Sequence, residues 1–155
     1  MPLSNTITIT LTKEDMLASV QSLIWKHGEA IDNGENYRQV YGVKADGDNN
    51  AVDHRVLADA WERHAMDLCD MMRDYGASVT ETTGTKTISL GMSARWASND
   101  NTLKSLCDKY VSDGIIAEWY KAVDPNEAAA YITRMEADRR AIRSNIYSLN
   151  PPTYS

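Results

Sequence analysis

The acids and histidines of residues 51–75 are the side chains of this sequence that could most readily do chemistry. Carboxylates and imidazoles on one helix can bind a metal ion or exchange protons with a substrate. The segment carries Asp53, His54, Asp59, Glu62, His64, Asp67 and Asp70. A metal site on helices, however, needs ligands three or four residues apart on one face, as in a Glu-x-x-His pair repeated on two helices.

The spacing of these groups does not meet that requirement. Glu62 and His64 are two residues apart, which turns their side chains about 200° from each other around a helix. His54 and His64 are separated by about three helical turns. Asp67 shares a face with His64, but one such pair is more typical of a hydrogen-bonded or solvent-facing histidine than of a metal ligand. We therefore expect no metal-binding and no catalytic residues in this segment.

Motifs for nucleophilic catalysis and for phosphate or calcium binding are also missing from the sequence. It contains no GxSxG, no GxxxxGK[ST] and no Cys-His neighbour pair. If Asp46 of the turn ADGDNN is counted as the first position of a calcium loop, the twelfth is Leu57, where such a loop needs Glu. We expect a solvated turn there, no bound cofactor, and a protein that is not an enzyme.

Length, charge and cysteine content narrow the remaining possibilities for the kind of protein and its location. The 155 residues suffice for one domain with its own core, so we assign 1–150 to a single helical domain and 151–155 to an extended tail. A formal net charge of −6 argues against a dedicated nucleic-acid binder. Cys69 and Cys107 have no CxxC spacing, which favours small core residues in a reducing compartment. No stretch reads as a signal peptide or a membrane span, so we expect no membrane contact.

Hydrophobic periodicity predicts four helices. Their expected ranges are 13–32, 51–75, 100–123 and 125–149. The last has the clearest start signal, with Asp124 as N-cap, Pro125 at the first helical position and Glu127 at the third, and the following Asn-Pro-Pro ends it. Its apolar stripe comprises Ala128, Ile132, Met135, Arg139, Ile142, Ile146 and Leu149. Gly114 lies inside the third helix, where we expect a close helix contact or a kink.

The remaining residues predict a strand, a long connection and a hairpin. Alternating Thr and Ile over 6–12 indicate a short half-buried strand, and 34–51 form the connection. Residues 77–92 predict a β-hairpin that, being marginal alone, packs on the helices or pairs with another subunit. The expected fold class is mainly α: a four-helix bundle-like domain with a short N-terminal strand and a β-hairpin between the second and third helices.

An arginine cluster on the last helix is the other candidate for binding. Arg134, Arg139, Arg140 and Arg143 are interleaved with Glu136 and Asp138, which favours a solvated face of paired charges over a nucleic-acid site. The alternative is that these arginines bind acidic patches on a partner in a ring, given the acidic composition of the rest of the chain.

The order of elements and the end of the chain resemble a known group of proteins. A helix ends in Trp119-Tyr120-Lys121, a new helix starts at 124–127, and the last helix runs into the proline-bearing tail 147–154. This arrangement is similar to small virion proteins of tailed phages, including phages of gut Bacteroidetes, and through them to head–tail connector (adaptor) proteins.

The resemblance implies a non-enzymatic subunit of a homo-oligomeric ring, expected to be twelve-fold, in the neck of the virion. Its partners would be the portal protein and tail or neck proteins, with transient contact to genomic DNA passing through the lumen, and assembly would take place in the host cytoplasm. We expect these partner-binding residues: Tyr147, Leu149, Pro151, Pro152, Tyr154, Arg139, Arg140 and Arg143. We expect the hairpin to be an intersubunit or lumen element through Val79, Thr83, Gly84, Ile88 and Leu90.

Two alternatives remain at this point. A tail-completion or other neck-ring subunit would use the same parts one level lower in the virion. A small soluble regulatory or ligand-binding helical domain would instead be a monomer or dimer with a concave apolar pocket.

Overall fold

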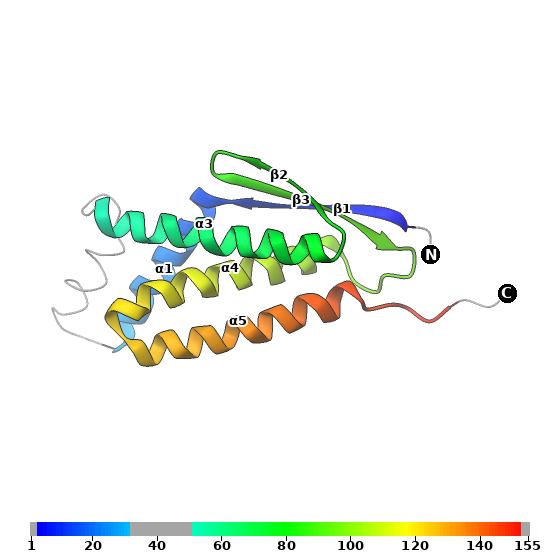
Figure 1. Cartoon of the computed structure of the whole chain (residues 1–155). Helices are drawn as coiled ribbons and strands as arrows, with labels where there is room; N and C mark the ends of the chain where they lie inside the picture. The colour runs from blue at the N-terminus through cyan, green and yellow to red at the C-terminus, as the bar shows by residue number, and fades with distance from the viewer. Residues whose placement is uncertain (1–2, 32–50, 153–155) are drawn as a thin grey trace.

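The fold is described from a computed structural model, which describes residues 3–31 and 51–152. The elements, in chain order, are β1 (Leu3–Thr12), α1 (Lys13–Ile31), α3 (Ala51–Asp74), β2 (Ser78–Thr82), β3 (Thr85–Ser93), α4 (Asp100–Val123) and α5 (Pro125–Ile146) (Figure 1). Four helices make up most of the described residues and the strands form one small antiparallel sheet, so the expectation of a mainly α protein is confirmed. The predicted connection 34–51 lies almost wholly outside the described residues.

The sheet has the strand order β1-β3-β2, so the N-terminal strand completes the sheet that the hairpin begins. β1 pairs antiparallel with β3, and the register runs from Leu3↔Ser93 to Thr12↔Thr85. β1 starts at Leu3, three residues before the start that the sequence periodicity predicts. Alternate positions of β3, and of β1 from Ile7 to Leu11, are buried against the helices, while the positions between them are Thr, Ser or Gly. β3 is therefore the central strand and is paired on both sides by strands of the same chain.

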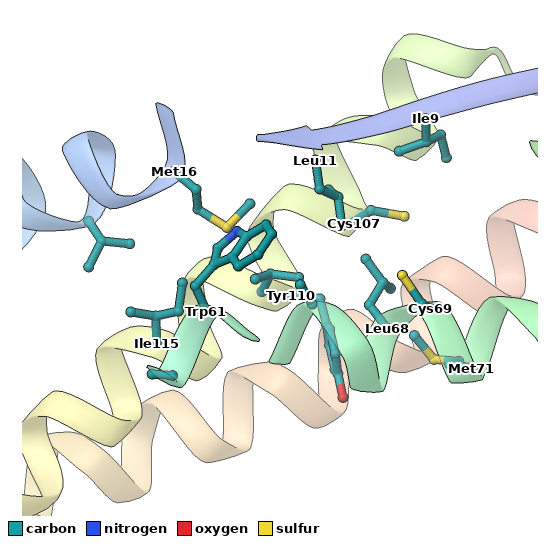
Figure 2. Close-up of a cluster of buried hydrophobic side chains, with 14 of the residues drawn as sticks. Ile9, Leu11, Met16, Trp61, Leu68, Cys69, Met71, Cys107, Tyr110 and Ile115 are labelled. Atoms are coloured by element: carbon teal, nitrogen blue, oxygen red, sulfur yellow. The ribbon is translucent and has the colours of Figure 1, made fainter. Parts of the chain in front are cut away.

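The elements pack in layers on either side of α4. In Figure 1 the sheet lies on one side of α3 and α4, and α5 lies on the opposite side. Because α4 contacts β1, α1, α3 and α5, it is apolar around most of its circumference rather than along one stripe. Figure 2 shows part of the resulting core, to which β1 contributes Ile9 and Leu11, α3 contributes Trp61 and α4 contributes Tyr110.

Asp124 separates α4 from α5, as its position before Pro125 predicts. Its side chain accepts hydrogen bonds from the backbone N–H of Asn126 at 3.2 Å and of Glu127 at 3.4 Å. Its own N–H, which a capping box assigns to Glu127, donates to the carbonyl of Tyr120 at 2.7 Å. The one residue thus caps the end of α4 and the start of α5.

Asp124→Ala is expected to lower the free energy of unfolding by about 1 kcal/mol, because the first N–H groups of α5 lose their acceptor. Urea denaturation followed by circular dichroism measures this change. Asp124→Asn, which keeps the side-chain oxygen, serves as the control and should retain most of the stability. Equal losses for the two variants would show that the cap is not the source of the effect.

The buried face of α5 differs from the stripe that the sequence predicts. Ala128 and Ile142 are buried as expected, but Ile132 is 42% exposed and Arg139 is also exposed. The third buried residue of α5 is Asp138, which the stripe omits. The cause is that α5 packs almost entirely on α4, so its contact face is narrow and is centred on a charged pair rather than on apolar residues alone.

Gly114 of α4 lies against the side chain of His64 of α3. A Cβ atom at this position would lie 2.6 Å from Cγ and Nδ1 of His64. Of the two expectations for this glycine, the close helix contact is therefore confirmed.

Candidate partner-binding groove

A groove between the end of α3 and the second half of α5 collects several of the expected partner-binding residues. It has a volume of about 380 Å³. Its lining comprises Met71, Asp74, Tyr75, Arg139, Arg140, Arg143 and Tyr147. All three arginines come from α5, while the opposite wall is built by residues at and just beyond the C-terminal end of α3.

Arg139 is held in place by a network that joins three helices. Its Nη2 donates to the hydroxyl oxygen of Tyr110 at 2.9 Å and to Oδ2 of Asp67 at 3.3 Å. Tyr110 in turn donates its hydroxyl proton to Asp67. Burial, and next the hydrogen bond to Asp67, raise the pKa of Tyr110, so this phenol stays protonated at neutral pH. The network fixes one guanidinium of the groove from α3, α4 and α5 together.

Arg140 and Arg143 are exposed and form no ion pair with any carboxylate of the described segments. Interleaved acids were expected to neutralise them. Asp138 instead turns inward, where its Oδ1 accepts from Nζ of Lys109 at 2.7 Å. Two guanidinium groups of the groove are therefore left to attract an anion from outside the described chain.

Tyr75 and Tyr147 form the aromatic part of the groove. Their rings meet edge to face, with centroids 5.7 Å apart and an interplanar angle of 83°. Tyr147 caps the end of α5 and is nevertheless 60% exposed. The groove thus offers guanidinium groups beside a partly open aromatic surface, a combination typical of protein interfaces.

The segment that follows the groove is tied to the chain's own body before the tail begins. Leu149 forms an isolated β-bridge with Trp96, and the N–H of Asn150 donates to the carbonyl of Arg95 at 2.6 Å. The indole N–H of Trp96 donates to the carbonyl of Asn145 at 2.8 Å. The Leu149 side chain remains 46% exposed. Sequence reasoning missed Trp96 as the anchor, although a tryptophan in a short connection between strand and helix was a possible signal.

The remaining expected tail residues divide into two groups. Pro151 and Pro152 are exposed and lie beyond the bridge to Trp96, where the extended tail was expected to start. Tyr154 lies outside the described residues.

The expected hairpin residues do not all face outward. Ile88 and Leu90 were expected to contact a second subunit or the lumen, but they are buried in the chain's own core, so their side chains are not available for either contact. The reason is the two-residue period of β3, which points these positions inward and the Thr and Ser between them outward. Val79 is half-buried, and Thr83 is exposed in the turn. Gly84 in the same turn has φ +74°, and its carbonyl accepts from the N–H of Lys13 at 2.9 Å.

The acids and histidines of α3 are dispersed rather than convergent. His64 packs on Gly114, with Nε2 3.5 Å from Oε1 of Glu118, and burial lowers the pKa of this histidine. Glu62 instead lies 3.5 Å from Nζ of Lys86, a buried lysine of β3. The side chains of Asp53 and His54 lie outside the described part. No group of three or more possible metal ligands gathers among the residues described.

A buried carboxyl pair between α4 and α5 was not anticipated from the sequence. Asp113 and Asp138 are 6% and 4% exposed, and Lys109 donates to both, at 3.4 Å and 2.7 Å. Burial, and next the hydrogen bond and charge of Asp138, raise the pKa of Asp113 to about 7. Oδ2 of Asp138 has no donor among the described residues. A proton shared between the two carboxyl groups would satisfy that oxygen.

Both cysteines are free and buried, as expected of small core residues. Burial raises the pKa of Cys107 to about 12, so this thiol is not a nucleophile near neutral pH. Within residues 3–31 and 51–152, no helix combines the length and the apolar character that crossing a bilayer requires.

Comparison with known proteins adds no relative to these observations. No family model matches the sequence, and neither a curated protein nor a solved structure is similar enough to count as a match.

Proposed function

We propose that this chain is a non-enzymatic structural protein of a tailed-phage virion, a head–tail connector (adaptor) subunit that joins the portal to the tail. In this proposal the subunits form a ring, and the helices are arranged as a bundle that makes its wall. The hairpin would contact a neighbouring subunit or the lumen through Val79, Thr83 and Gly84, since Ile88 and Leu90 serve the core. The virion neck would be its location.

The observation that carries the proposal is the groove between α3 and α5. It brings Arg139, Arg140, Arg143 and Tyr147, four of the residues expected to bind a partner, to one surface. The exposed Pro151 and Pro152 leave the body of the chain beyond it. A surface of this kind supports an assembly role better than a catalytic one, because its polar groups surround an open groove rather than converging on a reacting atom.

The two alternatives differ in how well they fit. A tail-completion or other neck-ring subunit would use the same surfaces, and only its position in the particle distinguishes it. A soluble ligand-binding domain calls for a concave apolar pocket. The cavities beside β1 and α1 are lined instead by polar residues such as Thr12, Asp15, Lys104 and Asp108, which disfavours that alternative.

The test is to purify particles of the phage that encodes the chain and to identify its place in them. We expect mass spectrometry to detect the chain in the particles, and cryo-electron microscopy to place it in a ring of about twelve copies between portal and tail. Density below the neck would favour the tail-completion alternative. Absence from the particles, with a concentration-independent monomer in solution, would overturn the proposal.

A further inference from the structure

We infer that the groove formed by Tyr75, Arg139, Arg140, Arg143 and Tyr147 binds an acidic segment of a different protein. Carboxylates of that segment pair with the arginines, and an apolar side chain next to them packs on the tyrosines. The inference rests on the proposed function, because it names the partner chemistry of the surface on which that function depends.

The arginines supply the charge and the geometry for carboxylates. Arg140 and Arg143 are three residues apart on α5, exposed, and free of ion pairs within the described chain. Each guanidinium presents N–H groups in a planar fork that matches a carboxylate. Arg139 uses Nη2 for Tyr110 and Asp67, and its other N–H groups remain available to a ligand. Because that network already orients Arg139, binding costs less side-chain entropy there.

The tyrosines favour a peptide over an inorganic anion. Tyr147 is 60% exposed, and the ring of Tyr75 supports it edge to face. Leu149, two residues further along the chain, is 46% exposed. An apolar side chain adjacent to the acids of a segment could therefore cover aromatic and aliphatic surface that is otherwise in contact with water.

The charges of the chain favour protein over nucleic acid as the occupant. The formal net charge of −6 repels a long polyanion, and Asp74 contributes a carboxylate to the groove itself. A groove of about 380 Å³ with three arginines is suited to a short segment that carries a few acids. A duplex would need a basic surface along several successive phosphates.

Some acids of the chain would have to give up existing ion pairs to bind the groove of a second copy, which favours a different protein. Eight of the 22 acids in the sequence are already within 4.0 Å of a basic side chain of the same chain. They are Glu62, Asp67, Asp70, Glu81, Asp108, Asp113, Glu118 and Asp138. A partner whose acids are not engaged in this way would give up fewer existing ion pairs on binding.

The test uses the full chain and fluorescence anisotropy with a labelled peptide of alternating Glu and Leu. We expect binding that weakens as salt is raised and that is lost when Gln replaces Glu in the peptide. Arg143→Gln and Arg140→Gln should each weaken binding about tenfold or more, because each removes a charge-assisted contact. Arg134→Gln is the matched control: this exposed arginine of α5 lies outside the groove, over the ring of Tyr131 at 4.4 Å, and its loss should change binding less than twofold.

Tyr147→Ala tests the aromatic part separately. It should weaken binding of the Glu-Leu peptide several-fold and should change binding of a Glu-Ser peptide much less. Circular dichroism on each variant verifies that the chain is folded.

Four outcomes would overturn the inference. The first is no peptide binding, and the second is an equal loss for Arg134→Gln and Arg143→Gln, which would indicate unspecific surface charge. The third is tighter binding of a short DNA duplex through the same arginines. The fourth is self-association that Arg143→Gln abolishes, which would identify a second copy as the occupant. Peptide binding by a chain that is absent from virions would leave the groove assignment intact and reject only the proposed function.

Discussion

Gly114→Ala is expected to lower the free energy of unfolding by about 1–3 kcal/mol, the range typical of overpacking a core. The added methyl carbon would lie 2.6 Å from two ring atoms of His64, closer than nonbonded carbon atoms approach each other. One of these atoms is Cγ, which lies on the Cβ–Cγ bond axis, so rotating the ring about that bond cannot remove the overlap. Either His64 must leave its position beside Glu118, or α3 and α4 must move apart.

The sign of this effect separates packing from helix propensity. Alanine is favoured over glycine inside a helix by about 1 kcal/mol, so propensity alone predicts that Gly114→Ala stabilises the protein. We expect the loss to disappear in a His64→Ala background and to become a gain of up to about 1 kcal/mol.

Urea denaturation of the wild type, both single variants and the double variant measures the coupling between the two positions. Ser105→Ala, at an exposed position of the same helix, is the control for a mutation without a packing change. A destabilisation by Gly114→Ala that persists undiminished without the His64 ring would show that the clash is not with this residue.

Local signals in the sequence were sufficient to place most elements. Asp124 and Pro125 determine the junction of α4 and α5 because capping depends on groups within one helical turn. The Thr-Ile alternation identified β1, since one face of a strand is buried and the other is not. Such patterns indicate which residues are buried, but they do not indicate which other segment of the chain packs on those residues. The partner of β1 was therefore not predictable. It is β3 of the same chain, and even the pair with the smallest sequence separation, Thr12↔Thr85, is 73 residues apart.

The α5 side of the candidate groove was predictable from the sequence, but its opposite wall was not. The density of arginines on α5 and the aromatic residue at its end were visible in the sequence. The opposite wall, with Tyr75 and Asp74, comes from a different helix end, and helix–helix packing depends on side-chain shapes along both surfaces. The inward turn of Asp138, which leaves Arg140 and Arg143 unpaired, depends on Lys109 of α4 in the same way. Contacts between distant segments are what the sequence pattern alone could not supply.

The buried carboxyl pair makes a second strong prediction, a dependence of stability on pH. Asp113 and Asp138 lie between α4 and α5, with Lys109 as the cation that contacts both. Burial raises the pKa of Asp113 from an ordinary value of 3.8 to about 7. The folded protein therefore binds a proton between these pH values that the unfolded chain releases. The stabilisation that comes from protonated Asp113 is therefore complete below about pH 4 and is lost as the pH rises toward 7.

Titration of His64 changes stability with pH in the opposite direction, so its contribution must be separated from that of Asp113. Burial lowers the pKa of His64 below its ordinary value of 6.5. The unfolded chain then binds the extra proton, and stability falls as the pH decreases below about 6.5. The difference between the wild type and a variant at Asp113 removes this contribution, because His64 is unchanged in both.

Asp113→Asn imitates the protonated carboxyl group, since its amide can donate to Asp138 and carries no charge. We expect the wild type to lose stability from pH 5 to pH 8 relative to Asp113→Asn, with the change centred below the folded-state pKa of about 7. Urea denaturation at a series of pH values measures the difference.

Asp108→Asn is the matched control, because Asp108 forms a half-buried i,i+4 pair with Lys104 on the same helix and does not contact Asp113 or Asp138. It should leave the pH dependence of the wild type intact. If the stability difference between the wild type and Asp113→Asn is constant across this pH range, the two carboxyl groups do not share a proton. Lys109 then forms ion pairs with both carboxylates, and the attachment of α5 to α4 depends on conventional ion pairs rather than on a titrating group.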